Sequence, residues 1–61
     1  MVNAITVNGQ TMKVLNSWSA GPGGEPHTFQ VAGAIVERIG SVWQMQRRGQ
    51  FPVRVTVEVQ P

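Results

Sequence analysis

Residues 27–50, HTFQVAGAIVERIGSVWQMQRRGQ, decide the fold class of this chain because their apolar residues fit two periodicities. Drawn as a helix, the segment has one continuous apolar half, and Arg47-Arg48-Gly49 makes a typical helix end with cations at the negative pole of the dipole. The apolar half comprises Val31, Ala32, Ile35, Val36, Ile39, Val42 and Trp43. Drawn as strands, residues 28–32 and 34–38 meet at Gly33, and Gly40 turns the chain into residues 41–46.

The glycines and the branched residues favour strands. Gly33 and Gly40 would each cost ~1 kcal/mol inside a helix, whereas Val, Ile, Phe and Trp prefer extended backbone. We therefore predict an all-β fold, a small meander or barrel of five to six strands. The alternative is an α+β fold, a β-β-α-β layer with a helix at about residues 28–48 packed on a three-stranded sheet.

The N-terminal flank of this segment predicts a hairpin. Asn8-Gly9 is the preferred pair for a type I′ turn, and it separates the β-prone residues 4–7 from residues 11–15. Alternation then places one apolar set on a common face. This set is Ile5, Val7, Met12 and Val14.

The C-terminal flank predicts one long strand, residues 51–60, with a buried face. Apolar residues alternate there with polar ones, and Pro52 near the start argues against a central position in the sheet. The apolar set is Phe51, Val53, Val55, Val57 and Val59. Among the aromatic residues, we expect Phe29, Trp43 and Phe51 to fill the core, because the chain has little else that is large.

Ser17 to Pro26 contains three glycines and two prolines, which predicts an exposed loop. Its glycines lack both the closing Gly-Lys-Ser/Thr and the Gly-x-Gly-x-x-Gly pattern of phosphate-binding loops. Trp18, just before these glycines, is the aromatic residue that we expect to reach a partner.

Size and charge point to association. A chain of 61 residues without Cys fits one domain, residues 1–61, with a marginal core and no disulfide. The pI near 10.7 reflects few acids rather than many bases, since the net charge is +2 and 13% of residues are charged. A weakly charged surface rich in Gln is easily desolvated against another copy or a partner.

The chain offers little catalytic or metal-binding chemistry. His27 is its single histidine, its three acids are Glu25, Glu37 and Glu58, and it contains no Asp, Cys or Tyr. No pattern of a nucleophile elbow, a carboxylate pair or a metal site is present. We therefore expect no catalytic residues, no metal, no cofactor and no enzymatic activity.

The leading functional hypothesis is a structural or adaptor module that self-associates or docks in a larger protein assembly, for which a viral particle is one setting. A long terminal strand either closes a barrel or pairs with another chain. The predicted protein interface is Trp18, Arg54, Thr56 and Glu58. The alternative is a small barrel that binds single-stranded nucleic acid through arginines and tryptophan. That site would comprise Arg38, Trp43, Arg47, Arg48 and Arg54, with Trp18 beside it.

Location is predicted only coarsely. No stretch approaches the ~18–20 apolar residues of a membrane span, and the N-terminus lacks the pattern of a secretory signal. We expect a cytoplasmic protein, or a virion component, without a membrane partner.

Overall fold

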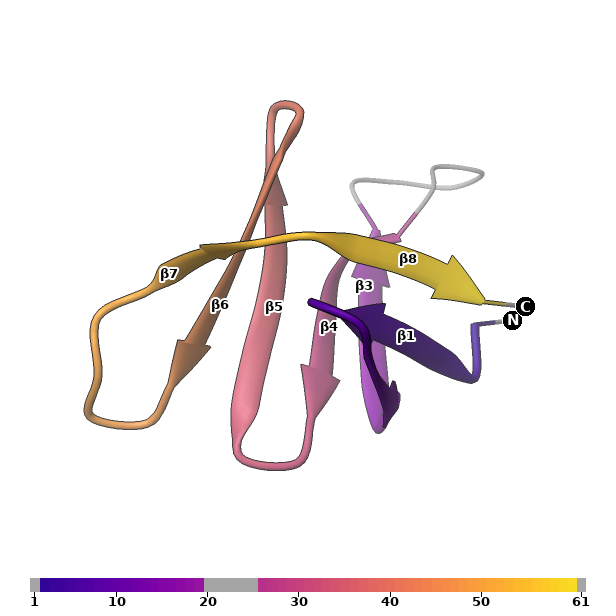
Figure 1. Cartoon of the computed structure of the whole chain (residues 1–61). Coiled ribbons are helices and arrows are strands. Elements are labelled where there is room, and N and C mark those ends of the chain that lie inside the picture. Colours follow the sequence, from indigo (N-terminus) through magenta and orange to yellow (C-terminus); the bar gives the residue numbers. More distant parts are fainter. Residues whose placement is uncertain (1, 20–25, 61) are drawn as a thin grey trace.

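The computed structural model describes residues 2–19 and 26–60, which form eight strands and no helix (Figure 1). The strands are β1 (Ala4–Val7), β2 (Gln10–Lys13), β3 (Asn16–Ser19), β4 (Pro26–Val31), β5 (Ala34–Ile39), β6 (Val42–Arg47), β7 (Val53–Val55) and β8 (Val57–Gln60). They make a three-stranded sheet in the order β2-β1-β8 and a five-stranded sheet in the order β3-β4-β5-β6-β7. Every pairing is antiparallel.

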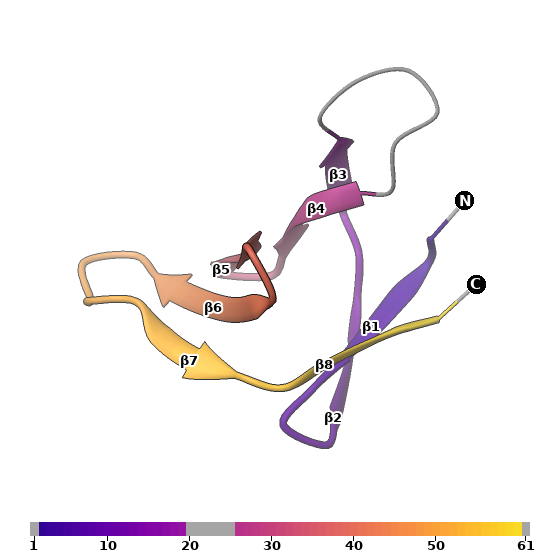
Figure 2. The same ribbon diagram turned by 90° about the horizontal axis from the view of Figure 1, so that it is seen from above.

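The two sheets are joined at two corners of the chain (Figure 2). Only residues 14–15 separate β2 from β3, and only Thr56 separates β7 from β8. The ladder continues round the first corner, where Val14 N donates to Asn3 O (3.0 Å) and Leu15 N donates to Gln30 O (2.8 Å). Because β8 pairs with β1, the first and last strands close the meander into a small barrel. The all-β prediction is thus confirmed.

The alternative with a helix at residues 28–48 is wrong. Gly33 (φ 74°) and Gly40 (φ 65°) both adopt left-handed backbone in the β4–β5 and β5–β6 turns, where an α-helix has no place for them. The apolar residues of this segment therefore divide between two faces of a sheet instead of lining one side of a helix.

The predicted N-terminal hairpin is confirmed. Asn8 (φ 49°) and Gly9 (φ 84°) form its turn, and Ile5 lies opposite Met12. The Asn8 side chain also reaches the second corner, where its Oδ1 accepts from Thr56 N (2.9 Å) and Thr56 Oγ1 (3.2 Å). In return, Asn8 N donates to Thr56 O (2.9 Å). This turn therefore fastens the hairpin to the bend between β7 and β8.

The core lies between the two sheets and is small. Its buried members are Ile5, Val7, Phe29, Val31, Ala34, Val36, Met45 and Val55. Phe29 is 0% exposed and stacks on the partly buried Trp43, with ring centroids 5.8 Å apart. Apolar residues from both sheets thus share one interior, as the alternation in the N-terminal hairpin predicts.

The final segment departs from its prediction. The expected strand 51–60 bends at Thr56, so its two halves, β7 and β8, join different sheets. Phe51 is 92% exposed, which makes its placement in the core wrong, and Val53 and Val59 are also exposed. Pro52 precedes β7, an edge strand, as its missing N–H requires.

Both ends of the predicted loop from Ser17 to Pro26 are strand, so the prediction is wrong at these positions. Asn16–Ser19 forms β3 and Pro26 begins β4, because this stretch pairs with β4 up to a register shift between Trp18 and Ser19. The remaining positions of that prediction, residues 20–25, lie outside the described residues.

Candidate functional site

The outward face of the five-stranded sheet carries apolar residues along its middle strand. On the middle strand, β5, Ala34 and Val36 point into the core, so the alternating residues Ile35, Glu37 and Ile39 face outward. Ile35 is 40% exposed and Ile39 is 56% exposed. Two isoleucines with one carboxylate between them therefore lie along the outward side of the middle strand, Ile35 near its start and Ile39 at its last residue.

Strand register aligns the outward side chains of this sheet in rows. The row through Glu37, called here the Glu37 row, runs Trp18, Thr28, Glu37, Gln44, Arg54 from β3 to β7. The neighbouring row contains Asn16, Gln30, Ile35 and Gln46. Pro52 comes beside Gln46, because the next residue, Val53, pairs with Met45. Amide and apolar groups thus outnumber the charges on this face.

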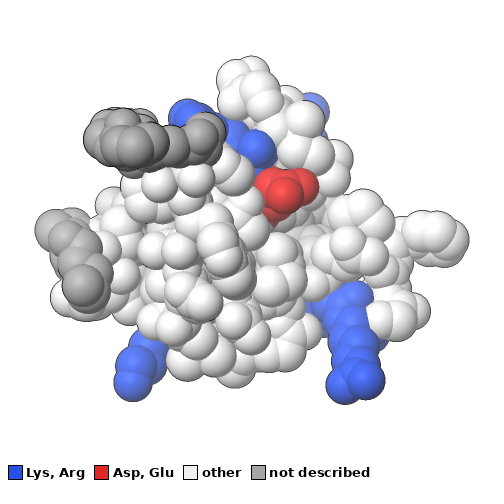
Figure 3. Space-filling model, turned by 180° about the vertical axis from the view of Figure 1, so that it is seen from behind, with Lys and Arg blue, Asp and Glu red and all other residues white. Residues whose placement is uncertain are grey.

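A shallow hollow marks the same face. Its volume is about 330 Å³, and it is lined by Ile35, Glu37, Gln44, Gln46 and Pro52. Seen from behind the five-stranded sheet, the Lys and Arg side chains lie at the margins, and the wide area between them is mostly uncharged (Figure 3). A hollowed sheet face with so few charges can be desolvated at low cost.

The turn between β6 and β7 presents an aromatic side chain next to this hollow. Gln50 N donates to Arg47 O (3.0 Å), Gln46 Nε2 donates to Gln50 O (3.1 Å), and Gly49 takes φ 75°. The exposed Phe51 and Gln46 line a common surface depression. Because hydrogen bonds hold the turn, Phe51 is displayed at little further cost in conformational entropy.

The structure places two of the four residues predicted for a protein interface in one row of the sheet. Trp18, 45% exposed, and Arg54 lie at opposite ends of the Glu37 row. Thr56 sits at the corner, where Asn8 accepts its hydrogen bonds. Glu58 lies opposite Thr6 on the outward face of the other sheet. Ile35 was not among the residues predicted for an interface. Its signal was the run of three consecutive apolar residues, 34–36: consecutive residues of a strand point to opposite faces, so both faces must carry apolar groups.

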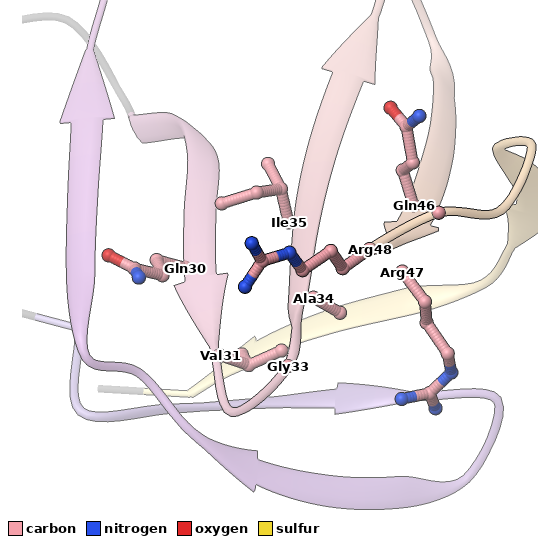
Figure 4. A pocket seen from close by; sticks show the side chains of 9 residues that line it. Gln30, Val31, Gly33, Ala34, Ile35, Gln46, Arg47 and Arg48 are labelled. Atoms are coloured by element: carbon pink, nitrogen blue, oxygen red, sulfur yellow. The ribbon is translucent and has the colours of Figure 1, made fainter.

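The residues predicted to bind nucleic acid divide among three places. Arg38 pairs in register with Trp43, and both line a cavity of about 270 Å³ together with Phe29. Arg47 and Arg48 lie at the other end of the β5–β6 hairpin (Figure 4). There Arg48 extends over the sheet toward Gln30 and Ile35, whereas Arg47 points away from them and lines a depression with Lys13.

Arg54, the last of this set, lies in the Glu37 row on the outward face of β7, opposite Gln44. It therefore belongs neither to the Arg38 cavity nor to the Arg47–Arg48 turn. These cations form no continuous track for a phosphate backbone.

The remaining polar chemistry is sparse in the part of the chain that the structure describes. His27 is half-buried, and its Nδ1 lies 2.9 Å from Thr28 Oγ1. Glu37 and Glu58 lie on different sheets. Within residues 2–19 and 26–60, no three His, Asp, Cys or Glu side chains gather where a metal ion could bind. The same residues contain no helix long and apolar enough to cross a membrane.

Comparison of the chain with protein-family models, with curated proteins and with solved structures gave no match. The surface chemistry of the described residues is therefore the basis for a functional conclusion.

Proposed function

We propose that this protein is a non-enzymatic module that acts by self-association, as a structural or adaptor component of a larger protein assembly. The observation that carries the proposal is the exposure of Ile35 and Ile39 on the outward side of β5, the middle strand of the open five-stranded sheet. Exposed apolar groups on the middle strand of a sheet, where an ordinary monomer usually carries polar side chains, are typical of surfaces that another protein covers.

Energetics support this function. Burial of apolar surface contributes about 25 cal/mol per Å², and the surface around Ile35 consists mainly of amides, which can find hydrogen-bond partners across an interface. The eight buried apolar residues found among the described positions make a small core, which gives a protein of this size little stability of its own. Association stabilises the folded state by mass action, and this adds to the small stability that the core of a chain of this size provides.

Replacement of Ile35 by Glu tests the proposal. Sedimentation velocity over a dilution series is expected to show the wild-type chain shifting from a dimer to a monomer as it is diluted. Ile35→Glu should weaken this association by about tenfold or more, because it places a second carboxylate in the face that must lose water.

Leu15→Glu is the matched control, since Leu15 is 57% exposed but lies at the corner between β2 and β3. It should dimerise like the wild type. A wild-type chain that sediments as a monomer up to millimolar concentration would remove the proposed function.

A second candidate, binding of single-stranded nucleic acid, is favoured by the cavity that Arg38 shares with Trp43 and Phe29. A guanidinium beside stacked aromatic rings suits a nucleotide, whose base stacks and whose phosphate is anionic. This candidate ranks second because the other arginines predicted to bind nucleic acid lie outside this cavity.

Anisotropy of a labelled oligonucleotide, titrated at several salt concentrations, tests this candidate. Arg38→Gln should weaken binding and lower the slope of log affinity against log salt by about 1, as expected when one phosphate contact is lost. Arg54→Gln, outside the cavity, should leave both quantities nearly unchanged. Absence of binding at low salt would eliminate the candidate.

A further inference from the structure

We infer that the self-association is a two-fold dimer whose axis runs parallel to the strands over β6, so that Glu37 of each copy pairs with Arg54 of the other. The inference rests on the proposed function and adds to it the occupant of the face, a second copy of this chain, and the register of the contact.

The geometry follows from the Glu37 row. Glu37 on β5, Gln44 on β6 and Arg54 on β7 are successive members of it, and no ion pair joins Glu37 to Arg54 within the chain. Neighbouring strands are about 4.8 Å apart, so the two charges lie at equal distances on either side of β6. A half-turn about an axis over β6 exchanges these sides. Each carboxylate then faces a guanidinium of the second copy, and Gln44 faces Gln44.

The neighbouring row matches under the same half-turn. Ile35 on β5 and Pro52 before β7 lie on either side of Gln46, so Ile35 meets Pro52 of the second copy. Phe51, next to Pro52, lies at the rim of this contact. Arg48 extends over the sheet toward Ile35 (Figure 4), on the side to which the half-turn brings Phe51 of the second copy. An Arg side chain over an aromatic ring is a favourable pair. The most exposed aromatic residue thereby gains a partner.

Other two-fold axes would bring like charges together or leave Glu37 without a cation opposite it. An axis over β5 would set Glu37 against Glu37, and an axis over β7 would set Arg54 against Arg54, both repulsive. An axis perpendicular to the strands places β5 of one copy over β5 of the other. Glu37 would then face Glu37 of the second copy, or the apolar Ile35 or Ile39 of that copy. Among these axes, the one over β6 is the axis that pairs Glu37 with Arg54.

The contact is narrow. A barrel is convex on its outer side, so three strands, β5 to β7, reach the second copy. β5 and β6 have six residues each and β7 has three. At ~3.4 Å per residue and ~4.8 Å per strand, the footprint is on the order of 200–300 Å² per copy. Contacts of this size fall in the transient class, so the dimer should dissociate on dilution to micromolar concentration. Trp18, on β3 at the far edge of the sheet, stays outside the contact.

Charge reversal provides the test. Glu37→Arg places two guanidinium pairs face to face and Arg54→Glu places two carboxylate pairs face to face, so each variant alone should dimerise at least about tenfold more weakly than the wild type. A mixture of the two variants should form heterodimers, because both cross-copy contacts then join a carboxylate to a guanidinium. Native mass spectrometry distinguishes homodimers from heterodimers, and the double variant should recover homodimers.

Glu58→Arg, with the same charge change on the other sheet, is the control. It raises the net charge of each copy from +2 to +4 and should therefore leave dimerisation unchanged or weaken it only slightly. If the wild type dimerises but the mixture forms no heterodimer, the register is wrong while the proposed function stands. If the wild type remains a monomer at all concentrations, both are wrong.

Discussion

Phe29→Ala is expected to leave most of the chain unfolded at 25 °C. Phe29 is 0% exposed and stacks on Trp43 with ring centroids 5.8 Å apart, so its loss opens a cavity in the centre of the core. Truncation of a buried Phe to Ala costs about 3–5 kcal/mol. A core of this size supplies about the same total stability, roughly 3–5 kcal/mol. The substitution therefore removes nearly all of it.

Far-ultraviolet circular dichroism and the dispersion of amide resonances measure this loss directly. Phe51→Ala is the matched control: it deletes the same atoms from a side chain that is 92% exposed, and it should change the free energy of unfolding by less than about 0.5 kcal/mol. If Phe29→Ala kept a cooperative transition within about 1 kcal/mol of the wild type, Phe29 could not be the centre of the core.

Asn8→Ala is expected to lower the free energy of unfolding by about 2 kcal/mol. The Oδ1 of Asn8 accepts from both Thr56 N and Thr56 Oγ1, and these bonds hold the corner between β7 and β8 against the first hairpin. Exposed hydrogen bonds contribute at the low end of about 0.5–1.5 kcal/mol each. Ala at the positive φ of position 8 adds a backbone cost of about 1 kcal/mol.

Asn8→Gly separates the two contributions. It removes the same side-chain bonds but tolerates positive φ, so it should be about 1 kcal/mol less destabilising than Asn8→Ala. Urea titrations of both variants, carried out below the concentration of association, measure the difference. The amide of Thr56 should also exchange faster in both. Equal stability of Asn8→Gly and the wild type would mean that the corner holds without the Asn8 side chain.

The strands and turns were predictable because local chemistry specifies them. Asn and Gly are the residue types that a type I′ turn prefers, so Asn8-Gly9 specifies its turn. Gly33 and Gly40 disfavour a helix interior, and both take positive φ in the turns of the structure. The helical alternative for this segment had a physical cause: β5 carries apolar residues on both faces, Ala34 and Val36 inward and Ile35 and Ile39 outward. Such a run satisfies the helical period as well as the strand period.

The end of the chain was not predictable in the same way. Alternation shows which residues point to the same side of the strand: Phe51, Val53, Val55, Val57 and Val59. It does not show how far the core extends along that strand. Because the strand bends at Thr56, burial is confined to its middle, and Phe51 falls in the turn before β7.

Which residues lie together in the candidate site depends on the register of strand pairing. The sequence identified Trp18 and Arg54 as interface residues without showing that Glu37 shares their row. It also gathered arginines that the barrel separates, since Arg38 and Arg47 lie at opposite ends of one hairpin. Such relations are set by pairing between distant segments, which a local pattern does not encode.

Ala4 lies opposite Gln60, so the ring of strands is sealed by its earliest and its latest members. Until β8 pairs with it, the second edge of β1 keeps unpaired backbone amides. Closing so long a loop is entropically slow, which places the folding time of this barrel in the range of about milliseconds to seconds. An edge that is open for that time is the kind of edge at which strand exchange between two copies begins.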